Sequence, residues 1–128
     1  MMKEGRVVTR ESRVVVAHCP RASSFFSRLR GLLGRDSLGA DTALLIDRCG
    51  AVHTVGMRFP LDLIFIDSAW QVTRIVRNVP PGKLMVTGGW HASRVYEIEA
   101  GKVCLEDLKK GDLLQWCPFD ADEEKQIK

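Results

Sequence analysis

Short apolar and β-branched runs dominate the pattern of hydrophobic positions along the chain. The most apolar run spans residues 61–66 and is interrupted only by Asp62, so its length and composition predict a core β-strand. Asp67 to Trp70 separates this run from the next and predicts a hairpin turn. Similar runs predict short strands over residues 6–9, 13–17, 43–46, 49–57, 71–79, 84–87, 94–99 and 113–117.

One segment instead has the period of an amphipathic helix. Pro20 suits the first turn of such a helix, and Gly34 suits the position just beyond its end. The apolar stripe consists of Ala22, Phe25, Phe26, Leu29, Leu32 and Leu33. No alternation of strands and helices follows, so we expect a mainly β (α+β) fold. It would be a compact antiparallel barrel or sandwich of about seven short strands with one packed amphipathic helix.

Composition places the chain among ordinary soluble proteins. Its 128 residues are 45% hydrophobic and 27% charged, which excludes disordered, collagen-like and low-complexity chains. We expect a single domain over 1–128, with a core over about 6–117 and a frayed, charged tail over 118–128. No apolar run approaches the ~20 residues of a membrane span, and no signal peptide is recognised. We therefore expect a cytoplasmic protein without membrane contact.

The net charge of +3 hides an uneven distribution. Residues 1–40 hold eight Arg and Lys against three acids, whereas residues 98–128 hold five against eight. Arg21, Arg28 and Arg35 repeat every seven residues along the predicted helix and are candidate anion-binding residues. A solvated helix edge is the alternative that we favour. No aromatic residues alternate with these arginines, so nucleic-acid binding is not expected.

The cysteines and histidines show no metal-site spacing. Cys19, Cys49, Cys104 and Cys117 form no C-x-x-C pair, and we expect four free thiols. On a strand, Cys49 and His53 would lie ~13 Å apart, too far to share a metal ion directly. A bent loop would bring them together, with His91 as a third ligand or with the two acting as a nucleophilic pair. We expect neither a metal nor a cofactor.

Asp62 is the first candidate for chemistry, because a buried carboxylate is costly unless it is paired or hydrogen-bonded. Arg58 and Arg94 are candidate partners. Asp62 would then act as a general base or ligand acceptor, or would only tie a strand to a loop. Trp90 in a glycine-rich loop is a candidate ligand contact. The full candidate pocket contains His53, Met57, Arg58, Asp62, Trp90 and Glu97.

Three segments carry a resemblance to a known family. They are Arg30 to Leu38, His53 to Asp67, and Val95 to Gly101 followed by Gly111-Asp112. In order and spacing they resemble an uncharacterised bacterial and archaeal family, domain of unknown function 192. The resemblance implies a compact, mostly β fold with one helix, and no established reaction, substrate or cofactor. Two segments depart from the family pattern: residues 55–59, and Trp70, which stands where the hairpin turn usually has Gly.

The leading functional hypothesis is a small binding or accessory module with a polar pocket and an unknown small-molecule or protein partner. One alternative is a hydrolase-like enzyme using Asp62 with His53 or Cys49. A second is a weak nucleic-acid or anion binder acting through the basic N-terminal half. The motifs of P-loops, Rossmann sites, zincin proteases and the common hydrolase elbow do not occur. The sequence leaves the oligomeric state open.

Overall fold

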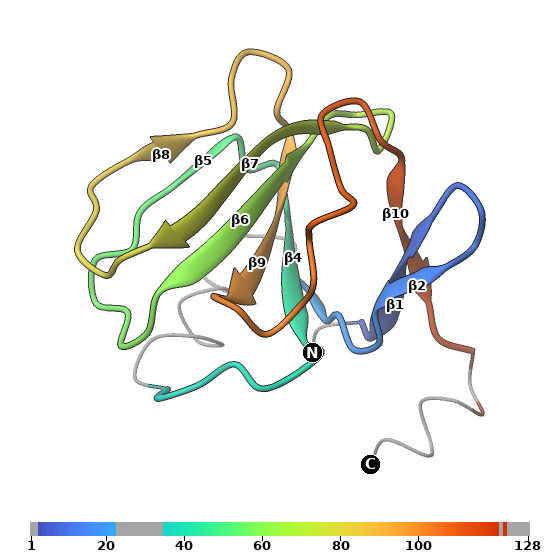
Figure 1. Cartoon of the computed structure of the whole chain (residues 1–128), viewed down its shortest axis with the longest axis horizontal. Coiled ribbons are helices and arrows are strands. Elements are labelled where there is room, and N and C mark those ends of the chain that lie inside the picture. Colours follow the sequence, from blue (N-terminus) through green and yellow to red (C-terminus); the bar gives the residue numbers. More distant parts are fainter. Residues whose placement is uncertain (1–2, 23–34, 121, 123–128) are drawn as a thin grey trace.

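The computed structural model describes residues 3–22, 35–120 and 122. Its strands form sheets of five, three and two members (Figure 1). The mainly β prediction is confirmed. The strands are β1 (Gly5–Thr9), β2 (Val14–Val16), β3 (Arg21–Ala22), β4 (Ala43–Asp47), β5 (Ala51–Val52), β6 (Leu61–Ile66), β7 (Val72–Val79), β8 (Val86–Thr87), β9 (Arg94–Glu99) and β10 (Leu114–Pro118).

The five-stranded sheet has the order β3-β4-β9-β6-β7. Every residue of β6 is buried, as expected for the most apolar run of the chain. β6 and β7 form the predicted hairpin, and β9 lies between β4 and β6 in antiparallel register with both. β3 is the exception to the antiparallel prediction, because it pairs in parallel with β4.

The three-stranded sheet, in the order β10-β1-β2, packs against one face of the large sheet and gives a sandwich-like arrangement. Two buried hydrogen bonds lie in this region, of which the first joins the two sheets and the second joins β10 to the segment between β2 and β3. The Tyr96 hydroxyl donates to the Leu114 carbonyl at 3.0 Å, and Trp116 Nε1 donates to the Cys19 carbonyl at 2.8 Å. The described strands do not close into the barrel that the sequence left as an alternative. The core between the layers includes Val7, Val16, Leu45, Ile64, Ile66, Tyr96, Ile98, Leu114 and Trp116.

The other face of the large sheet carries a second apolar core. Side chains alternate between the two faces along each strand, so neighbours in sequence divide between the two cores. The second core is covered in part by residues 52–59 and by the two-stranded sheet of β5 and β8. Its members include Leu38, Leu44, Ile46, Val52, Met57, Phe59, Leu61, Leu63, Phe65, Val79 and Val95.

The predicted helix falls largely on residues 23–34, which lie outside the described part of the chain. Its first apolar position, Ala22, belongs to β3, and no helix element occurs among the described residues. The backbone of Pro20 and Arg21 is hydrogen-bonded to two different segments. Arg21 N donates to the Lys3 carbonyl at 2.8 Å, and Leu45 N donates to the Pro20 carbonyl at 3.0 Å. These tertiary hydrogen bonds override the local helix-start signal of Pro20.

One further segment departs from expectation. The strand predicted over residues 49–57 is reduced to β5, because Gly56 adopts φ 86° and Met57 N closes a turn on the Thr54 carbonyl at 3.2 Å. In the β6–β7 turn, Trp70 adopts φ 63°, a left-handed conformation that favours Gly. Asp67 Oδ1 stabilises that turn by accepting from Ala69 N and Gln71 N at 2.8 and 3.0 Å.

Candidate functional site

Asp62 is 5% exposed and holds the backbone where β7 bulges. Its Oδ1 accepts from Asn78 N at 2.9 Å, and its Oδ2 accepts from Gly101 N at 3.2 Å. Asn78 has φ 53°, so the carboxylate stabilises an unusual backbone conformation. The partners expected from the sequence are replaced by two amides, because Arg58 and Arg94 bind other carboxylates.

Asp62 and Glu97 lie on opposite faces of the large sheet. Asp62 stands across from Ile98, whereas Glu97 stands across from Leu63 in the same antiparallel pair. Directly opposed residues share a face and successive residues alternate, so the two acids point in opposite directions. Glu97 is fully buried on the face of the second core. The two carboxyls therefore cannot line one pocket, contrary to the candidate grouping.

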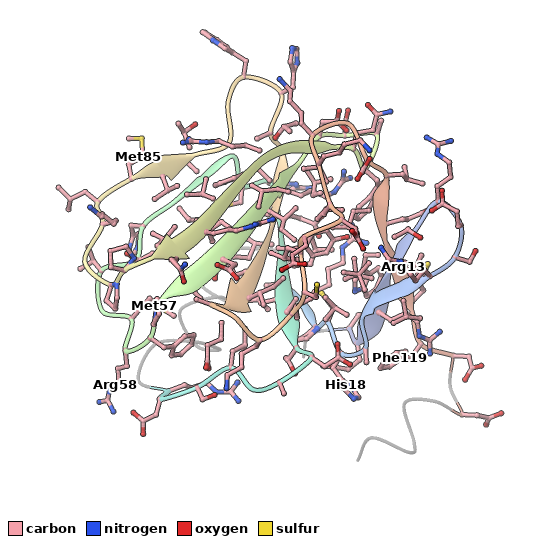
Figure 2. All side chains as sticks on the ribbon, in the orientation of Figure 1. Arg13, His18, Met57, Arg58, Met85 and Phe119 are labelled. Atoms are coloured by element: carbon pink, nitrogen blue, oxygen red, sulfur yellow. The ribbon has the colours of Figure 1, made fainter. Side chains whose placement is uncertain are left out.

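The other candidates are also spread over different environments. Met57 is 6% exposed and packs in the second core, while the next residue, Arg58, points outward (Figure 2). Arg58 forms an exposed ion pair with Asp36 at 3.1 Å. Trp90 is completely exposed, and His53 is partly buried after β5. A functional role for any one of them stays a prediction.

The cysteines and histidines are placed apart. The Cys49 thiol donates to the Ala51 carbonyl at 3.1 Å, and His91 is exposed in the loop after β8. Within residues 3–22 and 35–120, no three His, Cys, Asp or Glu side chains gather closely enough for a metal site. The four cysteines are free thiols, of which Cys19 is buried; burial raises its pKa above the ordinary range.

The clearest polar constellation lies elsewhere, around Asp47 at the end of β4. Arg21 binds this carboxylate with two hydrogen bonds, from Nε at 2.6 Å and from Nη2 at 2.9 Å. Arg94 donates to the same group from Nε at 3.1 Å and to the Asp67 carbonyl from Nη1 at 3.0 Å. One carboxylate is therefore shared by two guanidinium groups, which leaves a positive charge in excess.

Strand pairing explains why these groups meet. Asp47 ends β4 and stands across from Arg94, the first residue of β9, and Arg94 also stands across from Ile66, the last residue of β6. Three strand ends and the β6–β7 turn thus lie at one edge of the sheet. Arg21 reaches the same edge from β3. The prediction that Arg21 belongs to a basic line along a helix is therefore wrong. Of the other two residues of that line, Arg28 lies outside the described residues and Arg35 is exposed.

Aromatic rings hold the arginines in place. The Arg94 guanidinium carbon lies 4.1 Å from the centre of the Trp70 ring, within cation–π range. The Arg21 guanidinium carbon lies 5.4 Å from the Trp70 ring and 4.9 Å from the Trp116 ring. The left-handed conformation of Trp70 therefore coincides with a contact to both arginines, which a glycine could not provide.

The electrostatics follow from this geometry. Burial alone would raise the pKa of Asp47, but hydrogen bonds and charge from Arg21 and Arg94 hold that pKa below its ordinary value. The hydrogen bonds that Arg21 donates to Asp47 raise the pKa of the Arg21 guanidinium. Asp47 and Arg21 are therefore both charged at neutral pH.

These residues line a cavity of about 550 Å³. Its lining residues are Arg21, Asp47, Arg48, Ser68, Ser93 and Arg94, giving three positive charges against one negative charge. Arg48 is exposed at the mouth and has φ 53°. The Ser93 hydroxyl is buried and finds no hydrogen-bond partner within the described residues. Arg21 and Arg94 each use only part of their five N–H donors on Asp47 and Asp67.

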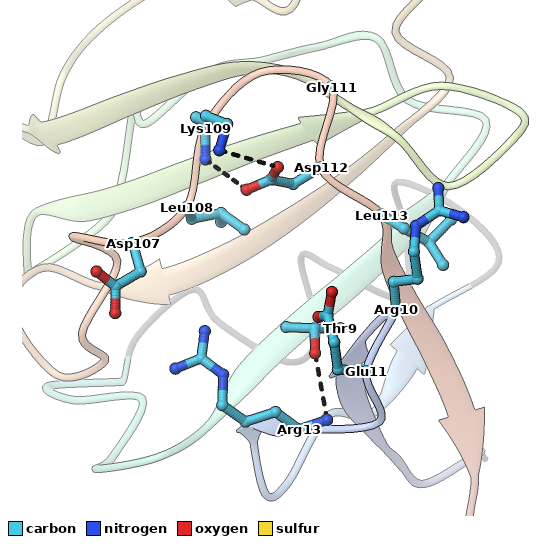
Figure 3. Close-up of a pocket in the computed structure, with 10 residues that line it drawn as sticks. All are labelled: Thr9, Arg10, Glu11, Arg13, Asp107, Leu108, Lys109, Gly111, Asp112 and Leu113. Atoms are coloured by element: carbon cyan, nitrogen blue, oxygen red, sulfur yellow. Dashed lines mark hydrogen bonds and ion pairs between the residues drawn. The ribbon is translucent and has the colours of Figure 1, made fainter.

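Two other cavities lack this excess of charge. One of about 280 Å³ lies between the β1–β2 turn and residues 107–113, where three cationic side chains face three acidic ones (Figure 3). Its polar groups already bond to one another: Arg13 N donates to Thr9 Oγ1 at 3.2 Å, and Lys109 N donates to Asp112 Oδ2 at 2.9 Å. The other, of about 380 Å³, adjoins Asp62 and is likewise balanced, with Arg77 and Lys102 against Asp62 and Glu106.

The sequence interpretation missed Asp47, Arg48, Ser68 and Ser93, and it assigned Arg94 to a different acid. A usable signal was present, since Asp47 ends an apolar run and Arg94 begins one. Antiparallel neighbours place the end of one strand beside the start of the other. Knowing that β4 pairs with β9 was necessary to use that signal, and no local pattern reveals this pairing.

Comparison with solved structures supports the fold. A Sinorhizobium meliloti 1021 protein described as a "putative transcription regulator" matches with a TM-score of 0.73 and 24% identity, over 91% of this chain and 94% of that one. A protein of unknown function from Novosphingobium aromaticivorans DSM 12444 matches with a TM-score of 0.72 and 22% identity, over 88% and 84%. At these identities the likeness establishes the fold alone.

A comparison with curated proteins finds no significant match. The described residues contain no helix that is long and apolar enough to cross a membrane. The model of the family described as "Uncharacterized ACR" (DUF192) matches residues 6–116, which contain β2 to β9, the arginine-lined cavity and the Asp62 bulge. The chain therefore belongs to the DUF192 family, as its sequence segments suggested.

Proposed function

We propose that this protein is a binding module for a small anionic ligand carrying a phosphate or carboxylate group. The single observation that carries the proposal is the cavity at the edge of the large sheet, where Arg21, Arg48 and Arg94 face one carboxylate. Partly buried charges are ordinarily balanced, so a surplus of cations favours an anionic guest. This proposal keeps the expected binding module and moves its site away from Asp62.

The unused hydrogen-bond donors support the same ligand chemistry. Planar guanidinium groups match the spacing of oxygens on phosphate and carboxylate, and charge-assisted bonds of this kind are strong. Asp47 and the Trp70 ring hold Arg94 in one orientation, so little side-chain freedom is lost on binding. The buried Ser93 hydroxyl supplies a neutral donor for one further ligand oxygen.

The test measures whether inorganic phosphate stabilises the protein. We expect the melting temperature to rise with phosphate concentration at constant ionic strength, because a ligand that binds only the folded state stabilises it. Arg48→Ala should weaken phosphate affinity about tenfold and leave the unliganded melting temperature unchanged, since Arg48 is exposed. Isothermal titration calorimetry gives the affinity directly.

Arg10→Ala is the matched control, because Arg10 is an exposed arginine of the charge-balanced cavity. This variant should bind phosphate as the wild type does. Equal losses in Arg10→Ala and Arg48→Ala would show a diffuse charge effect and contradict the proposed site. Replacing phosphate with citrate and with phosphoserine then tests which anion class the cavity prefers.

A further inference from the structure

A second surface, at the opposite ends of β8, combines exposed apolar side chains with positive charge. Leu84 is 86% exposed and Met85 is 73% exposed, immediately before β8. Val55, on the turn that is hydrogen-bonded to this segment, is 44% exposed, and Trp90, in the loop after β8, is fully exposed. Met85 projects from the outer edge of the molecule in Figure 2. Val55 and Leu84 lie on segments that hydrogen-bond to each other, and exposed large apolar groups on adjacent segments are typical of an interaction surface.

The backbone that carries these side chains is firmly held. Thr54 is fully buried and joins two turns: its N donates to the Lys83 carbonyl and its Oγ1 donates to the Pro80 carbonyl, at 2.9 and 2.7 Å. Lys83 N and Gly82 N donate back to Thr54, each at 2.9 Å. The exposed apolar groups therefore project from a fixed support.

Two cationic residues lie beside this surface. Lys83 directly precedes Leu84, and Arg74 contacts β8. Arg74 Nη1 donates to the Thr87 carbonyl at 2.6 Å, which places its positive charge beside β8. Among the described residues, no carboxylate forms an ion pair with Lys83 or Arg74.

We propose that this apolar and cationic surface docks on an anionic lipid bilayer. Aliphatic tips beside lysine and arginine suit the boundary between acyl chains and negatively charged headgroups, and an exposed tryptophan suits the same depth. A nucleic acid would match the charge but would leave Leu84 and Met85 without a partner. The expectation of no membrane contact rested on the lack of a spanning segment, which does not bear on peripheral docking.

The test is flotation of the full chain with vesicles. We expect binding to vesicles of equal parts phosphatidylglycerol and phosphatidylcholine, and little binding to pure phosphatidylcholine. Binding should weaken in about 0.5 M salt, because salt screens the attraction between the cationic side chains and the anionic headgroups. The double substitution Leu84→Ser with Met85→Ser should lower the partition coefficient about tenfold or more. Both side chains are exposed, so the melting temperature of this variant should match that of the wild type.

Val14→Ser is the matched control, because Val14 is a half-exposed apolar residue on β2, in the other sheet. It should bind anionic vesicles as the wild type does. Failure of the wild type to bind, or equal binding by the double variant, would overturn the proposal. So would either of two other outcomes: oligonucleotide binding without vesicle binding, or a wild-type dimer that the double variant converts to a monomer.

Discussion

At the scale of single residues, Asp62 and Asp47 show how two carboxylates near apolar strands acquire different tasks. Asp62 binds two backbone amides, so its role is to hold the β7 bulge and the turn at Gly101. Asp47 binds two arginines that line a cavity, so its role is to position donors. The nature of the partner, rather than the depth of burial, separates a structural acid from one that organises a site.

Asp62→Ala should therefore destabilise the fold by about 1–3 kcal/mol, because two buried amides lose their acceptor. Urea denaturation followed by circular dichroism measures the change in free energy of unfolding. Asp107→Ala, at an exposed position, should change that free energy by less than about 0.5 kcal/mol. Phosphate binding by the Asp62 variant should remain at the wild-type level, and a loss there would place Asp62 in the binding site after all.

The sequence predicted at this scale that Asp62 would be buried and hydrogen-bonded. It did not predict the partners, because Asn78 and Gly101 lie 16 and 39 residues away and contribute backbone atoms, whose chemistry every residue shares. The same limit applies to Arg94, whose true partner is 47 residues distant. Residue type indicates that a partner is needed, whereas only the fold decides which one it is.

At the scale of elements, the chain at the end of β8 packs closely on the large sheet because Gly88 has no side chain. A Cβ built on Gly88 would overlap the ring of Phe65, which is fully buried in the second core. Gly88 N also donates to the Gly50 carbonyl at 2.9 Å, and its carbonyl accepts from the Thr73 hydroxyl at 3.1 Å. The segment is therefore held at close approach by bonds on both sides.

Gly88→Ala should cost about 1–3 kcal/mol of stability through overpacking against Phe65. Gly82→Ala separates this effect from backbone strain, because Gly82 has φ 91° and open space where a Cβ would lie. Its cost should be about 1 kcal/mol, from the left-handed conformation alone. Thermal and urea unfolding of both variants provide the comparison, and a smaller loss at Gly88 than at Gly82 would refute the close packing.

Most strands could be predicted from period and composition, including all of β6 and the β6–β7 hairpin. The two-residue strands β3, β5 and β8 could not be delimited, because so short a run has no periodicity to detect. The sequence predicts a helix at β3 because Ala22 falls on the same helical stripe as Phe25, Phe26 and Leu29. Its extended form depends on hydrogen bonds to Lys3 on one side and to β4 on the other, which are contacts distant in sequence.

At the scale of the whole molecule, the Asp47 cluster joins the two layers. Asp47 and Arg94 belong to the large sheet, Trp116 belongs to the small one, and the Arg21 guanidinium contacts both Asp47 and the Trp116 ring. The charge state of one carboxyl therefore affects the stability of the entire sandwich.

Asp47→Asn should lower the free energy of unfolding at pH 7 by about 1–3 kcal/mol, because two arginines lose their ionised acceptor. The folded-state pKa of Asp47 lies below its unfolded value of about 3.9. Its stabilising contribution is thus complete above that value and is lost as the pH falls through the folded-state pKa. Unfolding curves at a series of pH values should show the wild type and the variant converging in acid.

Asp36→Asn is the comparison for an exposed ion pair, since Asp36 and Arg58 are both largely exposed. It should change stability little at any pH. A gap between the wild type and the Asp47 variant that stays constant down to pH 2 would mean that ionisation of Asp47 contributes nothing.

The pairing of β1 with β10 has a consequence for how the protein is made. Gly5 lies across from Pro118, so β1 is synthesised long before β10, the strand that becomes its second neighbour. Until then the nascent chain offers only the β1–β2 hairpin for one layer of the sandwich, and closing so long a loop is slow. The edge of β1 that later pairs with β10 is consequently open to aggregation during synthesis.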